Sequence, residues 1–109
     1  MAATIRVLGQ VAPSAASETS LYTCATTSAV ASSLWVCNTS STTPDTFSVR
    51  VCVSGAADNI KQLLFYLVTI PPNTSLSIVA GLSLANTDVV KVFATNGTCS
   101  FSLFGQENS

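Results

Sequence analysis

Hydrophobic and polar residues alternate with a period of two along most of the chain, which is the pattern of half-buried β-strands. In residues 47–54, every second residue is Phe or Val, and the residues between them are Ser, Arg or Cys. Segments rich in Gly, Pro, Asn, Ser and Thr separate eight such runs. The predicted strands are residues 2–8, 19–23, 30–37, 47–54, 61–70, 74–79, 88–95 and 100–104.

Four segments allow more specific structural predictions. Residues 30–37 are partly apolar on both faces, which indicates a strand that is central in its sheet or covered by a neighbour. The apolar run 61–70 is rich in aromatic and β-branched residues and ends at a proline pair, so we predict a strand there and not a helix. Residues 82–86 are predicted as a short link. Asn96-Gly97 is the strongest hairpin signal in the chain.

The chain is therefore predicted to be all-β: a single antiparallel β-sandwich of about eight strands, of jelly-roll or immunoglobulin-like topology. The pattern leaves the strand order open. With 109 residues the chain forms one domain, residues 1–109. We expect an extended N-terminal arm at residues 1–18 and a short C-terminal tail at residues 104–109.

Charged residues make up only 8% of the chain, against about 25% in typical soluble domains, while 48% of residues are hydrophobic. The formal net charge is −1, so little electrostatic repulsion keeps copies apart. The 16 Ser and 14 Thr supply polarity without the desolvation cost of a buried charge. This composition favours a protein whose surface is buried in an assembly over a free monomer.

The same composition argues against nucleic acid and membrane partners. The four basic residues are isolated in sequence and form no phosphate-binding stripe. The longest apolar stretch, residues 63–70, is too short to cross a bilayer. The first six residues lack the pattern of a secretory signal peptide, so we expect synthesis and folding in a cytosol.

The four cysteines are Cys24, Cys37, Cys52 and Cys99. They form no CxxC motif and the chain has no His, so neither a metal site nor a cofactor is expected. In a reducing compartment, free thiols packed as small hydrophobic groups are the default. A Cys37–Cys52 cross-strand disulfide is the alternative.

Catalysis is also disfavoured by the residue types present. Histidine, the commonest general base, is absent. The five acidic residues fall in predicted loops, strand ends or tails, where capping a turn is the simpler role. We therefore predict no enzymatic activity and no catalytic residues.

Several segments together carry a resemblance to a known family. They are residues 5–10 followed by 12–13 and 21–23, then 36–38, 55–58, 84–94 and 100–105. These segments resemble small virion structural proteins encoded by tailed bacteriophages, and the similarity spans nearly the full chain. The resemblance implies a capsid decoration (cement) protein or a tail- or neck-associated protein, with no catalytic residues to carry over.

The predicted function is a bacteriophage virion protein, made in the host cytoplasm, that stabilises the capsid shell through subunit contacts. Expected partners are copies of itself, with a trimer favoured, and other virion proteins such as the major capsid protein or a tail or neck protein. The two ends of the chain should be freest to reach a neighbour. The expected assembly contacts are Ile5, Arg6, Leu8, Gln10, Trp35, Phe104 and Gln106.

A second hypothesis is a receptor- or glycan-binding module of a tail or neck fibre. Trp35, Tyr22 and the polar loop 38–45 would form its binding face. A single tryptophan in a strand is more often part of a core or a subunit interface, so this remains the alternative.

Overall fold

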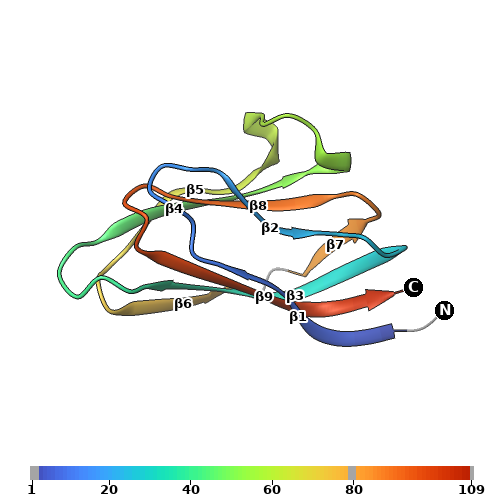
Figure 1. Cartoon of the computed structure of the whole chain (residues 1–109), viewed down its shortest axis with the longest axis horizontal. Helices are drawn as coiled ribbons and strands as arrows, with labels where there is room; N and C mark the ends of the chain where they lie inside the picture. The colour runs from blue at the N-terminus through green and yellow to red at the C-terminus, as the bar shows by residue number, and fades with distance from the viewer. Residues whose placement is uncertain (1–2, 79–80, 109) are drawn as a thin grey trace.

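The computed structural model describes residues 3–78 and 81–108 and consists of two antiparallel β-sheets packed face to face (Figure 1). The five-stranded sheet contains β1 (Ala3–Val11), β9 (Cys99–Asn108), β3 (Ser28–Asn38), β6 (Thr74–Ile78) and β7 (Leu82–Ala85). The four-stranded sheet contains β2 (Thr19–Thr23), β8 (Val89–Ala94), β4 (Asp45–Cys52) and β5 (Leu63–Ile70). Two short 3-10 helices, η1 (Val53–Gly55) and η2 (Ile60–Gln62), lie between β4 and β5. The predicted all-β sandwich is confirmed.

The strand pairs are nested along the chain, which settles the topology. β1 pairs with β9, β2 with β8, β3 with both β6 and β7, and β4 with β5. This is the arrangement of one long hairpin rolled into two sheets, the jelly roll, and not that of an immunoglobulin domain. The order is β1-β9-β3-β6 in one sheet, with β7 also on β3, and β2-β8-β4-β5 in the other.

Two local predictions are wrong. The expected link at residues 82–86 contains the strand β7, which continues the pairing on β3 where β6 stops. The Asn96-Gly97 turn forms no hairpin, because β8 and β9 belong to different sheets and the turn crosses between them. Gly97 has a φ of +69°, so the turn still uses the left-handed conformation that glycine favours.

The two ends of the chain are paired strands, not a free arm and a free tail. β1 and β9 lie side by side from the Ala3–Asn108 pair to the Val11–Phe101 pair, and both termini lie at the same end of the molecule (Figure 1). Residues 104–108 are the second half of β9. Met1, Ala2 and Ser109 of the expected arm and tail, and Val79 of the expected sixth strand, lie outside the described residues.

The core fills the space between the two sheets. Phe47 of the four-stranded sheet meets Phe101 of the five-stranded sheet edge to face, with ring centroids 6.1 Å apart. Leu34, Leu103 and other apolar side chains around this pair are completely or almost completely buried. Each such side chain contributes about 1.5–3 kcal/mol through burial, and this packing of the inner faces helps to hold the two sheets together.

A buried polar network closes one end of the sandwich. The Asn38 amide, which is not exposed, donates to the carbonyl oxygens of Thr43 at 3.0 Å and Ile70 at 3.1 Å. Its carbonyl oxygen accepts from the Thr98 hydroxyl at 2.8 Å, and the same hydroxyl lies 3.0 Å from the carboxylate of Asp45. The network ties both sheets to the turn after β8.

Candidate assembly surfaces

The outward side of the five-stranded sheet forms a continuous uncharged surface, which we call the sheet face. Residues that pair across neighbouring strands point to the same side, so the register defines its rows. The rows are Ile5, Gln106, Val30 and Ser83; Val7, Phe104 and Ser33; Gln10, Ser102, Trp35 and Ser77; and Ser100, Cys37 and Ser75. These side chains are apolar groups interspersed with hydroxyls and amides.

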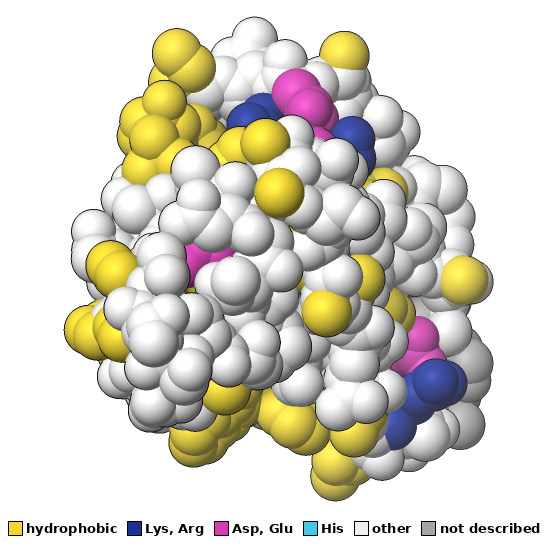
Figure 2. All heavy atoms as spheres, turned by 60° about the vertical axis from the view of Figure 1, so that its left-hand side comes forward, with side chains coloured by type: hydrophobic (Ala, Val, Ile, Leu, Met, Phe, Trp, Pro, Cys, Tyr) yellow, Lys and Arg dark blue, Asp and Glu magenta, His cyan; other side chains and the backbone are white. Residues whose placement is uncertain are grey.

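Large hydrophobic side chains are exposed on this surface. Ile5 is 84% exposed and Trp35 46%, while Val7 and Val30 are each more than two fifths exposed. Figure 2 shows the molecule turned by 60° from the view of Figure 1. On this side too, uncharged and hydrophobic side chains dominate, and charged ones occupy a few small areas. An uncharged sheet face with exposed isoleucine and tryptophan is typical of a surface that another molecule covers.

The structure gathers five of the seven expected contact residues on the sheet face. They are Ile5, Gln10, Trp35, Phe104 and Gln106.

The other two expected residues lie elsewhere. Leu8 is only 7% exposed, because it is the extra residue of a β-bulge and packs into the core. Arg6 is exposed at the edge of the sheet, where its guanidinium pairs with Glu107 at 3.1 Å. Leu8 is therefore wrong as a contact, and Arg6 lies beside the sheet face.

A second apolar surface follows β5, one of the two edge strands of the four-stranded sheet. We call it the β5 patch and define it by its exposed hydrophobic residues, Ile60, Leu64, Tyr66 and Leu67. Ile60 is 84% exposed and Tyr66 66%, and both line a hollow of about 690 Å³ beside Arg50 and Asp58. Edge strands usually carry charges or proline that prevent further pairing, and β5 has neither.

Sequence reasoning missed the β5 patch. The continuous apolar run of residues 63–70 looks like a strand buried on both faces, and its place at a sheet edge depends on distant strand pairing. For the sheet face, in contrast, the sequence does carry a signal, because residues 30–37 have apolar side chains on both faces of the predicted strand.

The carboxylates of the described residues are engaged in structural contacts. Glu18 pairs with Arg50 at 3.0 Å, and Asp58 pairs with Lys91 at 3.1 Å. Asp88 accepts from the backbone N–H groups of Ser54 at 2.9 Å and Ala85 at 3.0 Å. Among residues 3–78 and 81–108, no group of three or more His, Cys, Asp or Glu is arranged to hold a metal ion.

The residues of the alternative glycan-binding face do not come together. Tyr22 is 8% exposed and its hydroxyl donates to Glu107. Burial, together with this hydrogen bond, raises the pKa of Tyr22. Trp35 lies on the sheet face, and Asn38 and Asp45 at the ends of the polar loop are buried.

All four cysteines are free thiols, as predicted, and Cys37 and Cys52 lie in different sheets. Cys24, Cys52 and Cys99 are buried, whereas Cys37 is partly exposed on the sheet face. Burial, with Asp45 nearby, raises the pKa of Cys99 to about 12, so its thiol stays protonated at neutral pH. A cysteine reacts readily with an alkylating reagent only when it is a thiolate and the reagent can reach it.

We expect iodoacetamide to label Cys37 alone in the folded, dilute protein at pH 8, and all four cysteines after unfolding in urea. Mass spectrometry of the intact chain and of its peptides measures both outcomes. Labelling of Cys99 as fast as Cys37 without denaturant would contradict the packing described above.

The fold and these surfaces define an all-β jelly-roll domain with two exposed apolar surfaces. Comparisons with protein-family models, with curated protein sequences and with solved structures found no match. Within the part of the chain that the structure describes, no helix has the length and apolar character needed to cross a membrane.

Proposed function

We propose that this chain is a non-catalytic structural protein of a tailed-bacteriophage virion, a capsid decoration (cement) protein that stabilises the shell through subunit contacts. The observation that carries the proposal is the presence of two apolar surfaces, the sheet face and the β5 patch, on different sides of one small domain. A protein that links neighbours in a shell needs two such surfaces, because each contact is strengthened by the others.

The chemistry of both surfaces supports burial between proteins. Fully burying a large apolar side chain contributes about 1.5–3 kcal/mol, and several are exposed on each surface. The serines and glutamines of the sheet face form hydrogen bonds across an interface without the desolvation cost of a charge. A surface of this kind fits the apolar centre and polar rim of a stable protein interface.

The fold and the sequence resemblance agree with this proposal. Jelly rolls occur in viral capsid proteins, although they also occur in lectins, so the fold alone assigns no function. The structural use of Glu18, Asp58 and Asp88 supports a role without catalysis. The partners are then copies of the chain and the shell, tail or neck proteins of the virion.

We expect the chain to be present in purified virions of the phage that encodes it, and mass spectrometry of the particles measures this. A tagged chain supplied during infection should be incorporated, whereas the double variant L64A/Y66A should be incorporated about tenfold less, because it loses two side chains of the β5 patch.

S41A, in an exposed loop, is the matched control and should be incorporated as the wild type. Absence of the chain from virions, or equal incorporation of L64A/Y66A and wild type, would overturn the proposal. Circular dichroism of each purified variant separates loss of contact from loss of fold.

A further inference from the structure

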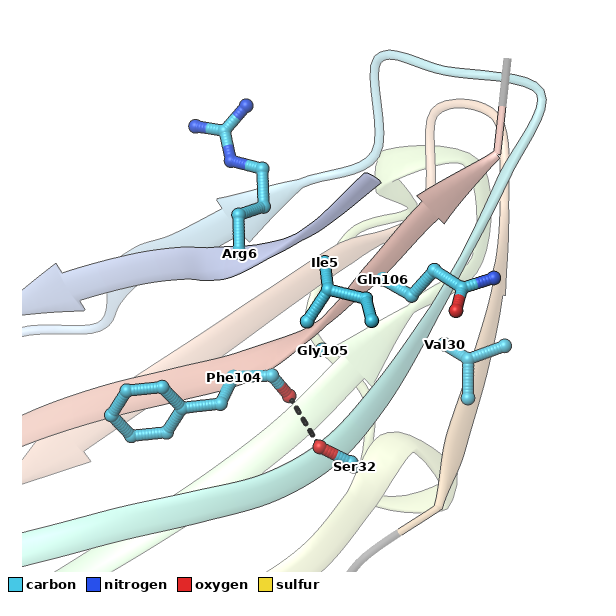
Figure 3. A pocket seen from close by; sticks show the side chains of 7 residues that line it. All are labelled: Ile5, Arg6, Val30, Ser32, Phe104, Gly105 and Gln106. Carbon is cyan, nitrogen blue, oxygen red and sulfur yellow. Dashed lines mark hydrogen bonds between the residues drawn. The ribbon is translucent and has the colours of Figure 1, made fainter. Parts of the chain in front are cut away.

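The sheet face contains a hollow of about 460 Å³ at the end nearest the chain termini. Ile5, Val30, Phe104 and Gln106 line it, together with Arg6, Ser32 and Gly105. Figure 3 shows the side chains of Ile5, Val30 and Phe104 around this hollow, while Arg6 points away from it. The walls are mainly hydrophobic, so the hollow suits an apolar or aromatic side chain.

The same face carries one exposed aromatic side chain of the required kind. Trp35 is the only tryptophan of the chain and is 46% exposed. Trp35 lies on β3, five residues after Val30. At about 3.3 Å per residue, the two positions are about 16 Å apart along the strand. The row of Val7, Phe104 and Ser33 lies between Trp35 and the hollow.

We propose that the sheet face binds the sheet face of a second copy of this chain in a two-fold dimer, with Trp35 of each copy in the hollow of the other. The symmetry axis lies between the two faces, runs across the strands and passes over the row of Phe104. A half turn about this axis exchanges the two ends of the strands. It therefore places each Trp35 over the opposite hollow, and both contacts form together.

A second copy fits this face better than an unrelated protein. The half-exposed ring of Trp35 and the hollow are on one surface, so one identical surface fills both, whereas another protein would have to supply a matching ring and hollow of its own. The rows of the sheet face contain no charged residue, and the guanidinium of Arg6 at the hollow is already paired with Glu107, so the face does not select a charged partner. Aromatic side chains that fill apolar pockets are the usual energetic centres of such interfaces.

The position of the two features also favours a dimer over a trimer. In a three-fold ring each subunit contacts its neighbours through two different patches, which must face in different directions. Here the side chain of Trp35 and the hollow face the same way, because both lie on the outward side of one sheet. The closed assembly that this face supports is therefore a two-fold dimer. It differs from the trimer that was expected from the sequence.

The area of the sheet face is sufficient for a stable dimer. Four strands at a spacing of about 4.8 Å and about ten residues at about 3.3 Å each cover roughly 19 Å by 33 Å, or about 630 Å². Specific, stable interfaces bury about 600–1,000 Å² on each partner, so the face lies at the lower end of this range. Packing of two twisted sheets with strands within about 30° of each other would be ordinary sandwich geometry.

Sedimentation equilibrium over a range of concentrations tests the dimer, with an expected mass of twice the 11.2 kDa of one chain. The fluorescence of Trp35 gives a second readout at a single site. As the dimer forms, the emission should shift to shorter wavelength, and acrylamide should quench it less, because the indole ring enters an apolar hollow.

Two variants on the sheet face and one control elsewhere sharpen the test. W35A removes the half-exposed indole ring and V30E places a carboxylate in the hollow, and each should raise the dissociation constant of the dimer at least tenfold. Y66A removes an even more exposed aromatic ring from the β5 patch and should leave the dimer unchanged. Urea unfolding of each variant checks that the fold is retained.

A wild-type chain that stays monomeric, a trimer mass, or a V30E variant that dimerises as tightly as wild type would overturn this inference. The inference uses the assembly role proposed above, and the two can fail separately. A monomeric chain that is found in virions overturns the dimer alone. A dimer that is absent from virions overturns the virion role alone.

Discussion

Replacing Asp45 with alanine is expected to lower the free energy of unfolding by at least about 3 kcal/mol. Asp45 is 1% exposed. Its carboxylate accepts from the backbone N–H groups of Thr46 at 2.7 Å, Asn96 at 2.8 Å and Thr98 at 3.1 Å. Alanine would leave these donors unpaired inside the protein, and each unpaired donor costs about 1–3 kcal/mol. The turn that crosses between the sheets would lose the group that holds it.

Urea unfolding followed by circular dichroism measures this change. The matched control is D58A, which removes a more exposed carboxylate whose partner is Lys91. We expect the control to lose less than about 1 kcal/mol, as exposed ion pairs usually do. Equal losses for D45A and D58A would show that the buried network contributes no more than a surface pair.

The pH dependence of the wild-type chain gives a second readout of Asp45. Burial by itself would raise its pKa, but the hydrogen bonds from Asn96, Thr98 and Thr46 outweigh burial and lower the pKa below its usual value. A lowered pKa in the folded state means that the carboxylate contributes stability above the pKa of the unfolded chain, about 3.9. That contribution is lost as the pH falls from there toward the folded pKa, and D45A should lack this part of the acid dependence.

The sequence predicted the strands well because a residue period of two is a local property. The clearest predicted run, residues 47–54, corresponds to β4 up to Cys52, while Val53 and Ser54 belong to η1. The partly apolar second face of residues 30–37 forms part of the sheet face. The local pattern could not show where a strand bulges. β3 has a bulge at Ser32, so Val30 points outward although simple alternation places it on the same side as Leu34, which is buried.

Features that depend on distant pairing were beyond the sequence pattern. Asn96-Gly97 has the chemistry of a hairpin turn, but β8 finds its partners in β2 and β4. The two chain ends look like free segments until they are paired with each other across the whole length of the chain. The exposure of the β5 patch likewise follows from β5 being last in its sheet, a position that no local run of residues encodes.

Gly105 is a buried position of the five-stranded sheet where a small change should have a large effect on folding. A Cβ atom there would lie 2.1 Å from the carbonyl oxygen of Val30 and 2.8 Å from the Cα of Ala31. Both are backbone atoms of the neighbouring strand β3, so no side chain can rotate to make room. G105A would force β3 away from β9, and we expect a loss of about 3 kcal/mol or more of unfolding free energy.

The control for this substitution is G81A. Gly81 has a φ of +58° and open space where a Cβ would lie, so alanine there adds only the cost of the left-handed conformation, about 1–2 kcal/mol. Thermal unfolding measures both variants, and 1 kcal/mol corresponds to a few degrees in Tm for a domain of this size. We therefore expect a fall in Tm of about 10 °C or more for G105A, or a chain that does not fold, and about half of that for G81A.

The position of Gly105 connects this stability effect to the sheet face. Gly105 lies in β9 between Phe104 and Gln106, which line the hollow, and its close approach to β3 brings Val30, another lining residue, beside them. If the glycine serves this packing, G105A should lose the native dimer together with the fold, whereas G81A should keep both. A G105A chain as stable as wild type would mean that β3 and β9 do not approach each other as closely as described.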